Sequence, residues 1–354
     1  MAKRKALLVA IAALGMQQSA SAHHSFAPHF DINKPVTISG TITEFESRNP
    51  HAYLHIEAVD ENGRTRQYVC ESHGVTQLTR NGIRPEMLPV GARVTVTGSQ
   101  ARRSPYECFF NTVELSDGRV LNVNGPSGRA PTAAIPTAEL AASAPQRHDI
   151  YGTWLLVPAN RSTSGPQPMM SLLTPAGRKA TEAYDPFADD PTFRCDPVAI
   201  RRVWFAPSTP LSIRRDGDRV ILKFEWMDVE RVVYLGMKAH PQSGPRTSLG
   251  HSIGHFEGDT LVIETGNYSA GVLSQYVEIP GQPTRGLLHS DALTSVERVS
   301  FDEASQRLKV QIELEDPVFY TRAFAPAMAQ YAPSDLTIQP FNCKPENPDH
   351  TLRQ

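Results

Sequence analysis

The sequence lacks the short motifs that assign many common functions. It contains no G-x-G-x-x-G, no Walker A motif and no C-x-x-C-H, so dinucleotide, nucleoside triphosphate and c-type haem binding are disfavoured. Its four cysteines include no C-x-x-C pair, which disfavours a cysteine-rich zinc site. An excess of positive charge is also missing, with 35 Lys and Arg against 37 Asp and Glu, and this argues against a nucleic-acid or anionic-membrane partner.

Long apolar runs are missing everywhere except near the N-terminus. There, basic residues at 3–5 precede an apolar stretch at 6–16 that is too short to span a bilayer, and an A-x-A site ends at Ala22. This pattern predicts a signal peptide over 1–22, no membrane span in the mature chain, and a periplasmic or secreted protein whose first residue is His23. The sequence does not predict the oligomeric state.

The four cysteines are expected to form disulfides in such an oxidising compartment. Cys70 and Cys108 lie in the first half of the chain, and Cys195 and Cys343 lie in the second. One bridge in each half is the simplest of the three possible connectivities. A thiol nucleophile is therefore not expected.

The first mature segment, 23–123, reads as short strands with one helix. Alternating apolar residues and an Asp-Glu-Asn-Gly turn predict three strands, a short helix ended by Gly82, and further strands after it. This order is that of a small OB-like Greek-key barrel. The expected strands are 36–45, 52–59, 65–72, 93–98, 108–115 and 119–123, and the expected helix is 75–81.

A segment rich in Ala, Pro and Ser at 124–147 is predicted to be a linker. The remainder, 148–354, opens on a G-x-W strand and continues as hairpins with Asp-Gly-Asp and Glu-Gly-Asp turns. Seven or eight antiparallel strands in series, with 320–324 as a further candidate, predict a lipocalin-like barrel. The whole chain is therefore expected to be mainly β.

Several motifs resemble those of uncharacterised families. "AHHSFAPHFDINKPVTISGTI", "NPHAYLHIEAVDENG" and "LPVGARVTVTG" resemble a family of secreted bacterial domains of unknown function that begin with A-H-H-S-F. "LTPAGRKA", "DPTFRCDP", "GHSIGHFEGDTLVIET" and "ERVSFD" are similar to a second uncharacterised family. The resemblance supports two domains in nearly the whole mature chain and implies no activity.

The histidines of the A-H-H-S-F motif are candidate metal ligands. Cleavage after Ala22 would give His23 an α-amine and an imidazole for one metal ion, and copper favours such nitrogen-rich sites. His24 is the next candidate. His51 is the third, because strand alternation places it on the face that also carries Tyr53 and His55. The alternative is a solvated tail beside a surface strand.

Residues in the later hairpins could line the interior of the barrel and perform acid–base chemistry. If Glu264 faces an apolar interior, its pKa would rise toward that of a general base. The alternative is that most of these residues lie on solvent faces or in structural ion pairs. The candidates are His251 or His289 as proton shuttle, Arg231 and Tyr320 as oxyanion or phenolate binders, and Glu264 or Glu297 as orienting carboxylate.

These patterns support two leading hypotheses. The first is a cofactor-independent periplasmic enzyme, acting as a lyase, isomerase or hydrolase on a small and possibly aromatic substrate in the barrel. The second is a ligand- or copper-binding protein without catalysis that uses His23, His24 and His51. A third hypothesis is a structural protein of the cell envelope.

Overall fold

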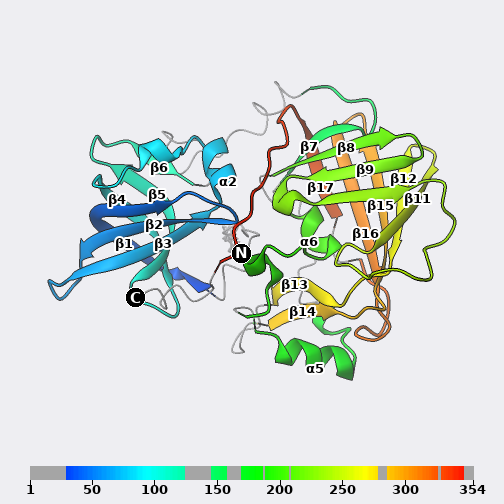
Figure 1. Cartoon of the computed structure of the whole chain (residues 1–354), viewed down its shortest axis with the longest axis horizontal. Coiled ribbons are helices and arrows are strands. Elements are labelled where there is room, and N and C mark those ends of the chain that lie inside the picture. Colours follow the sequence, from blue (N-terminus) through cyan, green and yellow to red (C-terminus); the bar gives the residue numbers. More distant parts are fainter. Residues whose placement is uncertain are drawn as a thin grey trace, which may run out of the picture.

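The computed structural model describes residues 29–123, 145–157, 169–185, 188–206, 209–277, 285–325 and 328–346. The predicted signal peptide, His23, His24 and nearly all of the predicted linker lie outside these ranges. The described chain is mainly β and forms two units, a six-stranded sheet and a closed nine-stranded barrel (Figure 1). None of its helices is both long and apolar enough to cross a membrane.

The N-terminal unit is a sheet of six strands in the order β3-β2-β1-β4-β5-β6, and β3 also pairs with β5 in parallel. Cys70 and Cys108 face each other in this last pair and form a disulfide. Apolar side chains that alternate along the strands fill the interior. The elements are β1 (Phe30–Glu46), β2 (His51–Val59), β3 (Thr65–His73), α2 (Val75–Arg80), η1 (Pro85–Met87), β4 (Arg93–Ala101), β5 (Glu107–Leu115) and β6 (Val120–Asn122).

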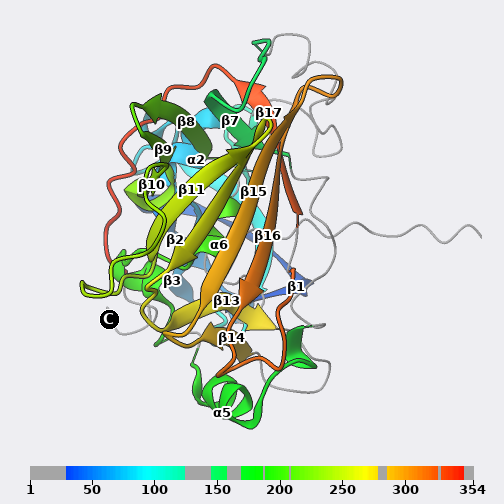
Figure 2. The same cartoon turned by 90° about the vertical axis from the view of Figure 1, so that its right-hand side faces the viewer.

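The C-terminal unit is a barrel closed in the order β10-β11-β12-β15-β16-β17-β7-β8-β9 (Figure 2). It has nine strands where seven or eight were expected, and β10 pairs with β11 in parallel, so the prediction of a wholly antiparallel barrel was wrong. The strands are β7 (Gly152–Leu156), β8 (Pro210–Asp216), β9 (Arg219–Phe224), β10 (Glu230–Tyr234), β11 (His251–Glu257), β12 (Thr260–Gly266), β15 (Thr294–Asp302), β16 (Arg307–Glu315) and β17 (Met328–Ser334).

The predicted strand at 320–324 is replaced by two isolated bridges, and β17 takes its place in the barrel. Elements that the alternation did not predict are not among the nine strands of the barrel. They are α5 (Pro175–Ala183), η3 (Pro191–Arg194), α6 (Ile200–Trp204), η4 (Trp226–Asp228), β13 (Gly271–Val277) and β14 (Arg285–His289).

Helix α6 fills one end of the barrel. Its residue Trp204 is fully buried and contacts strands from different parts of the wall, with its ring against Phe224 of β9 and Tyr331 of β17. Its indole N–H donates to Glu297 of β15. Because one side chain reaches three separated strands, it must lie inside the barrel, and the large apolar core around it excludes water from this end.

The two predicted disulfides are present, one in each half of the chain. The bridge between Cys195 and Cys343 closes a sequence separation of 148 residues. It ties the segment after β17, residues 335–346, to the loop around η3. This segment, red in Figure 1, runs between the two units.

Candidate functional site

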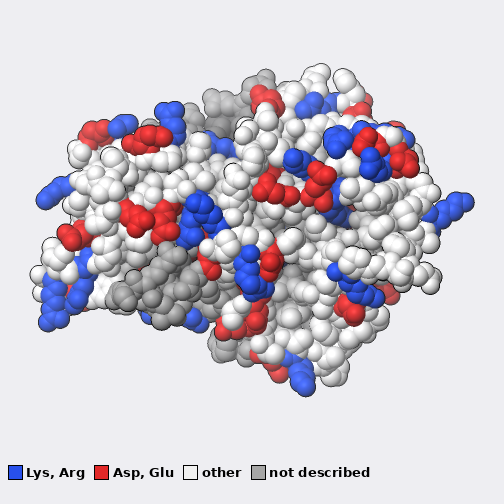
Figure 3. All heavy atoms as spheres, in the orientation of Figure 1, with Lys and Arg blue, Asp and Glu red and all other residues white. Residues whose placement is uncertain are grey.

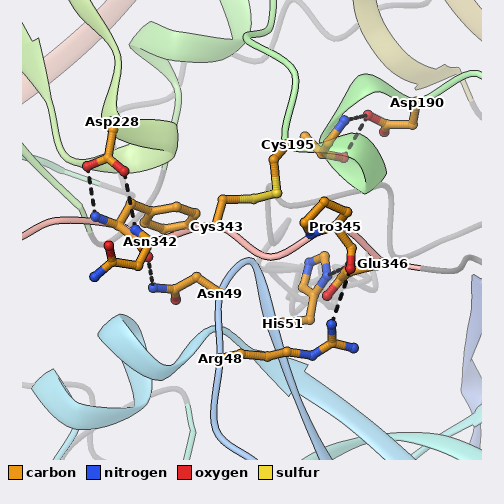
Figure 4. Close-up of a disulfide and its surroundings, with 12 residues drawn as sticks. Arg48, Asn49, His51, Asp190, Cys195, Asp228, Asn342, Cys343, Pro345 and Glu346 are labelled. Carbon is orange, nitrogen blue, oxygen red and sulfur yellow. Dashed lines mark hydrogen bonds and ion pairs between the residues drawn. A yellow bond between two sulfur atoms is a disulfide. The ribbon is translucent and has the colours of Figure 1, made fainter.

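The segment 335–346 is held firmly to the barrel unit (Figure 4). The carboxylate of Asp228 accepts hydrogen bonds from the backbone N–H groups of Phe341 at 2.8 Å and Asn342 at 3.2 Å. The disulfide of Cys343 follows, and the N–H of Glu346 donates to the carbonyl of Phe193 at 2.7 Å. The segment therefore has little freedom where it leaves the barrel.

The same segment also binds the N-terminal unit at the start of β2. The Asn49 side-chain amide donates to the Phe341 carbonyl at 2.6 Å, and the Lys344 N–H donates to the Asn49 carbonyl at 2.8 Å. A guanidinium nitrogen of Arg48 lies 3.4 Å from the Pro345 carbonyl. These contacts place the next residue, Glu346, against β2.

His51 and Glu346 meet there in a buried environment. The Nδ1 atom of His51 lies 2.8 Å from Oε2 of Glu346 and 3.9 Å from Oε1 of Glu71, and all three side chains are less than 8% exposed. His73 of β3, equally buried, is the ladder partner of His51. We call His51, His73, Glu71, Glu346 and the adjacent Tyr53 the interdomain histidine cluster.

The hydrogen bond to Glu346 also selects the chemical form of His51. A carboxylate only accepts, so Nδ1 carries the proton and Nε2 is the nitrogen with the lone pair when the ring is neutral. Metal-binding histidines in proteins usually show this arrangement, with one ring nitrogen held by a carboxylate while the other faces the metal.

Two carboxylates act on the electrostatic environment of Tyr53 in this cluster. Burial raises the pKa of Tyr53 well above its usual value, and the negative charges of Glu71 and Glu346 raise it further. Arg48 acts in the opposite direction, with its guanidinium carbon 4.9 Å from the centre of the Tyr53 ring. Two carboxylates in a buried space are costly unless positive charge compensates for them.

A third histidine lies next to this cluster. The His29 ring is 5.8 Å from the Phe193 ring, and the Phe193 carbonyl accepts the hydrogen bond from Glu346. On the N-terminal side, Phe109 contacts both His73, at 5.3 Å, and Phe30, at 5.6 Å. Aromatic rings thus pack around the polar groups and help to exclude water.

A second group of donors, on β1 and on the same face of β2, is more exposed than the cluster. Within the described ranges, Glu44, Glu46 and His55 are the set of three metal-type donors whose ligand atoms all lie within 4.8 Å of one another. A bulge between Ile42 and Glu44 turns both glutamates to the outer face while Ile42 stays in the core. We call this set the surface triad.

Among the barrel candidates, Arg231 and Glu297 form a bidentate ion pair inside the barrel, with N–O distances of 2.8 and 2.9 Å. The guanidinium also donates to Ser252 at 3.0 Å and Thr265 at 3.2 Å. Burial lowers the pKa of Arg231, but the charge and hydrogen bonds of Glu297 outweigh this effect and the pKa is raised. The two side chains satisfy each other, as in the structural alternative stated above.

His289 and Tyr320 lie together at the β13–β14 hairpin. The Tyr320 hydroxyl donates to the Leu288 carbonyl at 2.8 Å, and Nδ1 of His289 lies 3.0 Å from the Ser290 carbonyl. Burial lowers the pKa of His289 and raises that of Tyr320. Nε2 of His289 is buried and has no hydrogen-bond partner in the described part of the chain.

Tyr268 connects this pair to the barrel interior and was missed by the sequence reasoning. Its hydroxyl is 2.7 Å from the Ser295 hydroxyl, which belongs to the Glu297 network, and its ring is 6.0 Å from that of His289. Burial raises its pKa. In the sequence, Tyr268 is only an aromatic residue that follows a strand, and this pattern is too common to indicate a functional residue.

Glu264 and His251 point away from the barrel interior. Glu264 is half exposed and lies 3.9 Å from His255, so it does not face an apolar interior and the condition for its role as a general base is not met. The inner face of β12 carries Leu261, Ile263 and Thr265 instead. His251, also on the outer wall, lies against the ring of Tyr234. The six candidates therefore fall in three places: the barrel interior, the β13–β14 hairpin and the outer wall of the barrel.

Comparison with known proteins gives one similarity. Residues 10–107 match the model of a family of unknown function (DUF6152). A search of curated proteins found no match. The matched span includes His51, Glu71 and His73 but neither Glu346 nor the barrel. The N-terminal part of the chain is thus similar to a family of unknown function, and that part supplies most of the interdomain histidine cluster.

Proposed function

We propose that the protein is an exported metal-binding protein that holds a transition-metal cation, copper in the first place, in the interdomain histidine cluster. The observation that carries the proposal is the buried contact between His51 and Glu346, with Glu71 beside it. The hydrogen bond orients an imidazole as in known metal sites, and the carboxylates supply the negative charge that a cation would neutralise.

The donor set accounts for the choice of metal. Imidazole nitrogens suit Zn²⁺, Cu²⁺ and Ni²⁺, and the affinity of a given nitrogen and oxygen site generally peaks at Cu²⁺. His23 and His24 are proposed as additional ligands, with the α-amine of His23 available after cleavage at Ala22. Export and cleavage are part of the same proposal, and the two disulfides are typical of oxidising compartments.

The decisive experiment is a Cu²⁺ and Zn²⁺ titration of the mature full-length chain by calorimetry, with intact mass to define the N-terminus. Replacement of Glu346 by Gln keeps the size of the side chain and should weaken the interdomain site about 10–100-fold. Replacement of His51 by Asn should weaken it further. The matched control is His55→Asn, on the same face of the same strand.

Each outcome of this titration has a clear meaning. Loss of one equivalent of tightly bound metal ion in the His51 variant but not in the His55 variant supports the proposal. Loss in the His55 variant alone would place the metal in the surface triad and overturn it, as would unchanged affinity in the His51 and Glu346 variants. Circular dichroism would check that each variant keeps its β structure.

The finer fold assignments belong to the same proposal. We propose that the N-terminal unit is OB-like, supported by the parallel β3–β5 pair and by α2 between β3 and β4. The barrel is proposed to be lipocalin-like, supported by its meander of hairpins, although its β10–β11 pair is parallel. An experimental structure of either unit, compared strand by strand with these folds, would test both assignments.

A second candidate function, an acid–base lyase, isomerase or hydrolase, is favoured by the buried Nε2 of His289. A neutral imidazole with its pKa lowered by burial can accept a proton, and Tyr268 links it to the Arg231–Glu297 pair. The test is growth-substrate profiling of a deletion strain complemented with the wild type or with His289→Gln. Equal complementation by both would reject this function.

A further inference from the structure

A pair of histidines meets on the outer wall of the barrel, in neither of the sites described above. His240 belongs to the connection between β10 and β11, and His251 is the first residue of β11. Their Nδ1 atoms are 3.0 Å apart and their rings are almost perpendicular, at 88°. Both side chains are partly buried.

This separation suits two nitrogens that bind the same metal ion. With metal–nitrogen bonds of about 2.0–2.1 Å, two ligands at adjacent corners of a tetragonal Cu²⁺ lie about 2.8–3.0 Å apart. Without metal, the Nδ1–H of one imidazole donates a hydrogen bond to the Nδ1 of the other, which must be unprotonated. Metal binding replaces this shared proton, and the two nitrogens already have the separation that a shared ion requires.

The surrounding side chains hold the two rings in place. The ring of Tyr234 stacks on His251 with centroids 5.2 Å apart and an angle of 8°. His240 lies over Gly266, where an added Cβ would come within 3.2 Å of its Cδ2 atom. A site whose ligands are fixed before binding loses less entropy when the metal arrives.

The charges around the pair are also compatible with a cation. Burial and the neighbouring His251 lower the pKa of His240, which favours the neutral, metal-binding form, while Glu264 acts in the opposite direction. Glu264 supplies a negative charge on the adjacent strand β12, and it lies 3.9 Å from His255. Glu264 is half exposed, and its charge acts on His240.

We propose that His240 and His251 form a second transition-metal site, for Cu²⁺ or Zn²⁺, with the two Nδ1 atoms as ligands and Glu264 as the nearby carboxylate. It lies in the C-terminal unit, outside the span similar to the family of unknown function. The proposal does not depend on the interdomain histidine cluster, because no ligand is shared between the two sites.

The test is a Cu²⁺ titration of the mature full-length chain, followed by electron paramagnetic resonance. The wild type should show coupling to two imidazole nitrogens that is lost, with one equivalent of bound metal, in His240→Ala and in His251→Ala. His255→Ala, on the same strand and exposed, is the matched control and should keep the site. Gly266→Ala keeps both imidazoles and should weaken binding by displacing His240.

Retention of this equivalent in both His240→Ala and His251→Ala would overturn the proposal. Loss in His255→Ala but not in His240→Ala would also overturn it, by moving the metal to His255 and Glu264. A His51→Asn variant separates this site from the interdomain cluster, because it should keep the two-imidazole signal. Thermal unfolding of each variant, followed by circular dichroism, verifies that the barrel is intact.

Discussion

Replacing Glu297 by Gln should destabilise the barrel by about 3–5 kcal/mol, the range found when one partner of a buried ion pair is removed. Arg231 and Glu297 have side chains that are 2% and 0% exposed, so water cannot compensate either charge. Gln offers a single acceptor oxygen where Glu297 receives two N–H groups from Arg231 and one from Trp204. Its NH₂ group would face at least one of these donors.

Removing both charges should cost less than removing one. In Arg231→Met with Glu297→Leu, Ser252 and Thr265 still bond each other at 2.9 Å, so neither hydroxyl is left without a partner. The indole N–H of Trp204 loses its acceptor, at a cost of about 1–3 kcal/mol, whereas Ser295 loses Glu297 but keeps its hydrogen bond with Tyr268. The double variant should therefore be more stable than Glu297→Gln.

Equilibrium urea unfolding followed by tryptophan fluorescence measures both variants. All three tryptophans lie in the barrel unit, at positions 154, 204 and 226, so the signal reports the barrel without a contribution from the N-terminal sheet. A Glu297→Gln variant within about 0.5 kcal/mol of the wild type would refute the reasoning, since that is the range of ordinary surface substitutions. So would a double variant that is less stable than Glu297→Gln.

Three further predictions concern the disulfide, a buried histidine and a tight contact. Serine at both Cys195 and Cys343 should lower the free energy of unfolding by about 5 kcal/mol on the loop-entropy model for a 148-residue separation, and urea unfolding equal to that of the wild type would contradict this. Burial lowers the pKa of His289 in the folded chain. As the pH drops below the ordinary histidine value of 6.5, the unfolded chain therefore takes up a proton more readily than the folded chain, and the free energy of unfolding should fall. His289→Gln should flatten this dependence in urea unfolding at several pH values, and an unchanged slope would exclude His289 as its source. A Cβ at Gly98 would lie 1.8 Å from the carbonyl oxygen of Phe109. Gly98→Ala should therefore lower the free energy of unfolding by about 3 kcal/mol, because it forces β4 away from β5. An unshifted melting curve by circular dichroism would disprove this prediction.

The distribution of charge on the surface is consistent with the nearly equal numbers of basic and acidic residues in the sequence. On the face shown in Figure 3, acidic and basic side chains are interspersed over both units. The charges that matter for the proposals are instead few and local. They are the buried carboxylates of Glu71 and Glu346 and the exposed carboxylate of Glu264.

Local patterns predicted the strands and the bridges well. In β2, Ala52, Leu54 and Ile56 are buried in the core as the alternation requires, while His51 and His55 share the opposite face. Each of the two disulfides joins cysteines of the same half of the chain. Strands could be predicted because apolar and polar residues alternate along them, and disulfides because the number and spacing of the cysteines suggest their pairing.

Patterns of this kind could not say which face of a strand is the inner one. Glu264 shares a face with Val262, which is buried, yet that face is the outer wall of the barrel. The parallel pairing of β10 with β11 also escaped prediction, because a long connection without regular structure leaves the direction of pairing open. The packing of α6 inside the barrel depends on contacts of Trp204 with distant strands.

The sequence by itself determined that this is a chain of short strands with paired cysteines and a histidine on the polar face of β2. Only the tertiary structure decided that the His51 end of this face is buried, because it brings Glu346 to His51 across 295 positions of sequence. Strand alternation describes each strand alone, whereas the environment of an imidazole depends on every segment that packs against it. For that reason the charge around His51, and with it the proposed metal site, follows from the fold rather than from any motif.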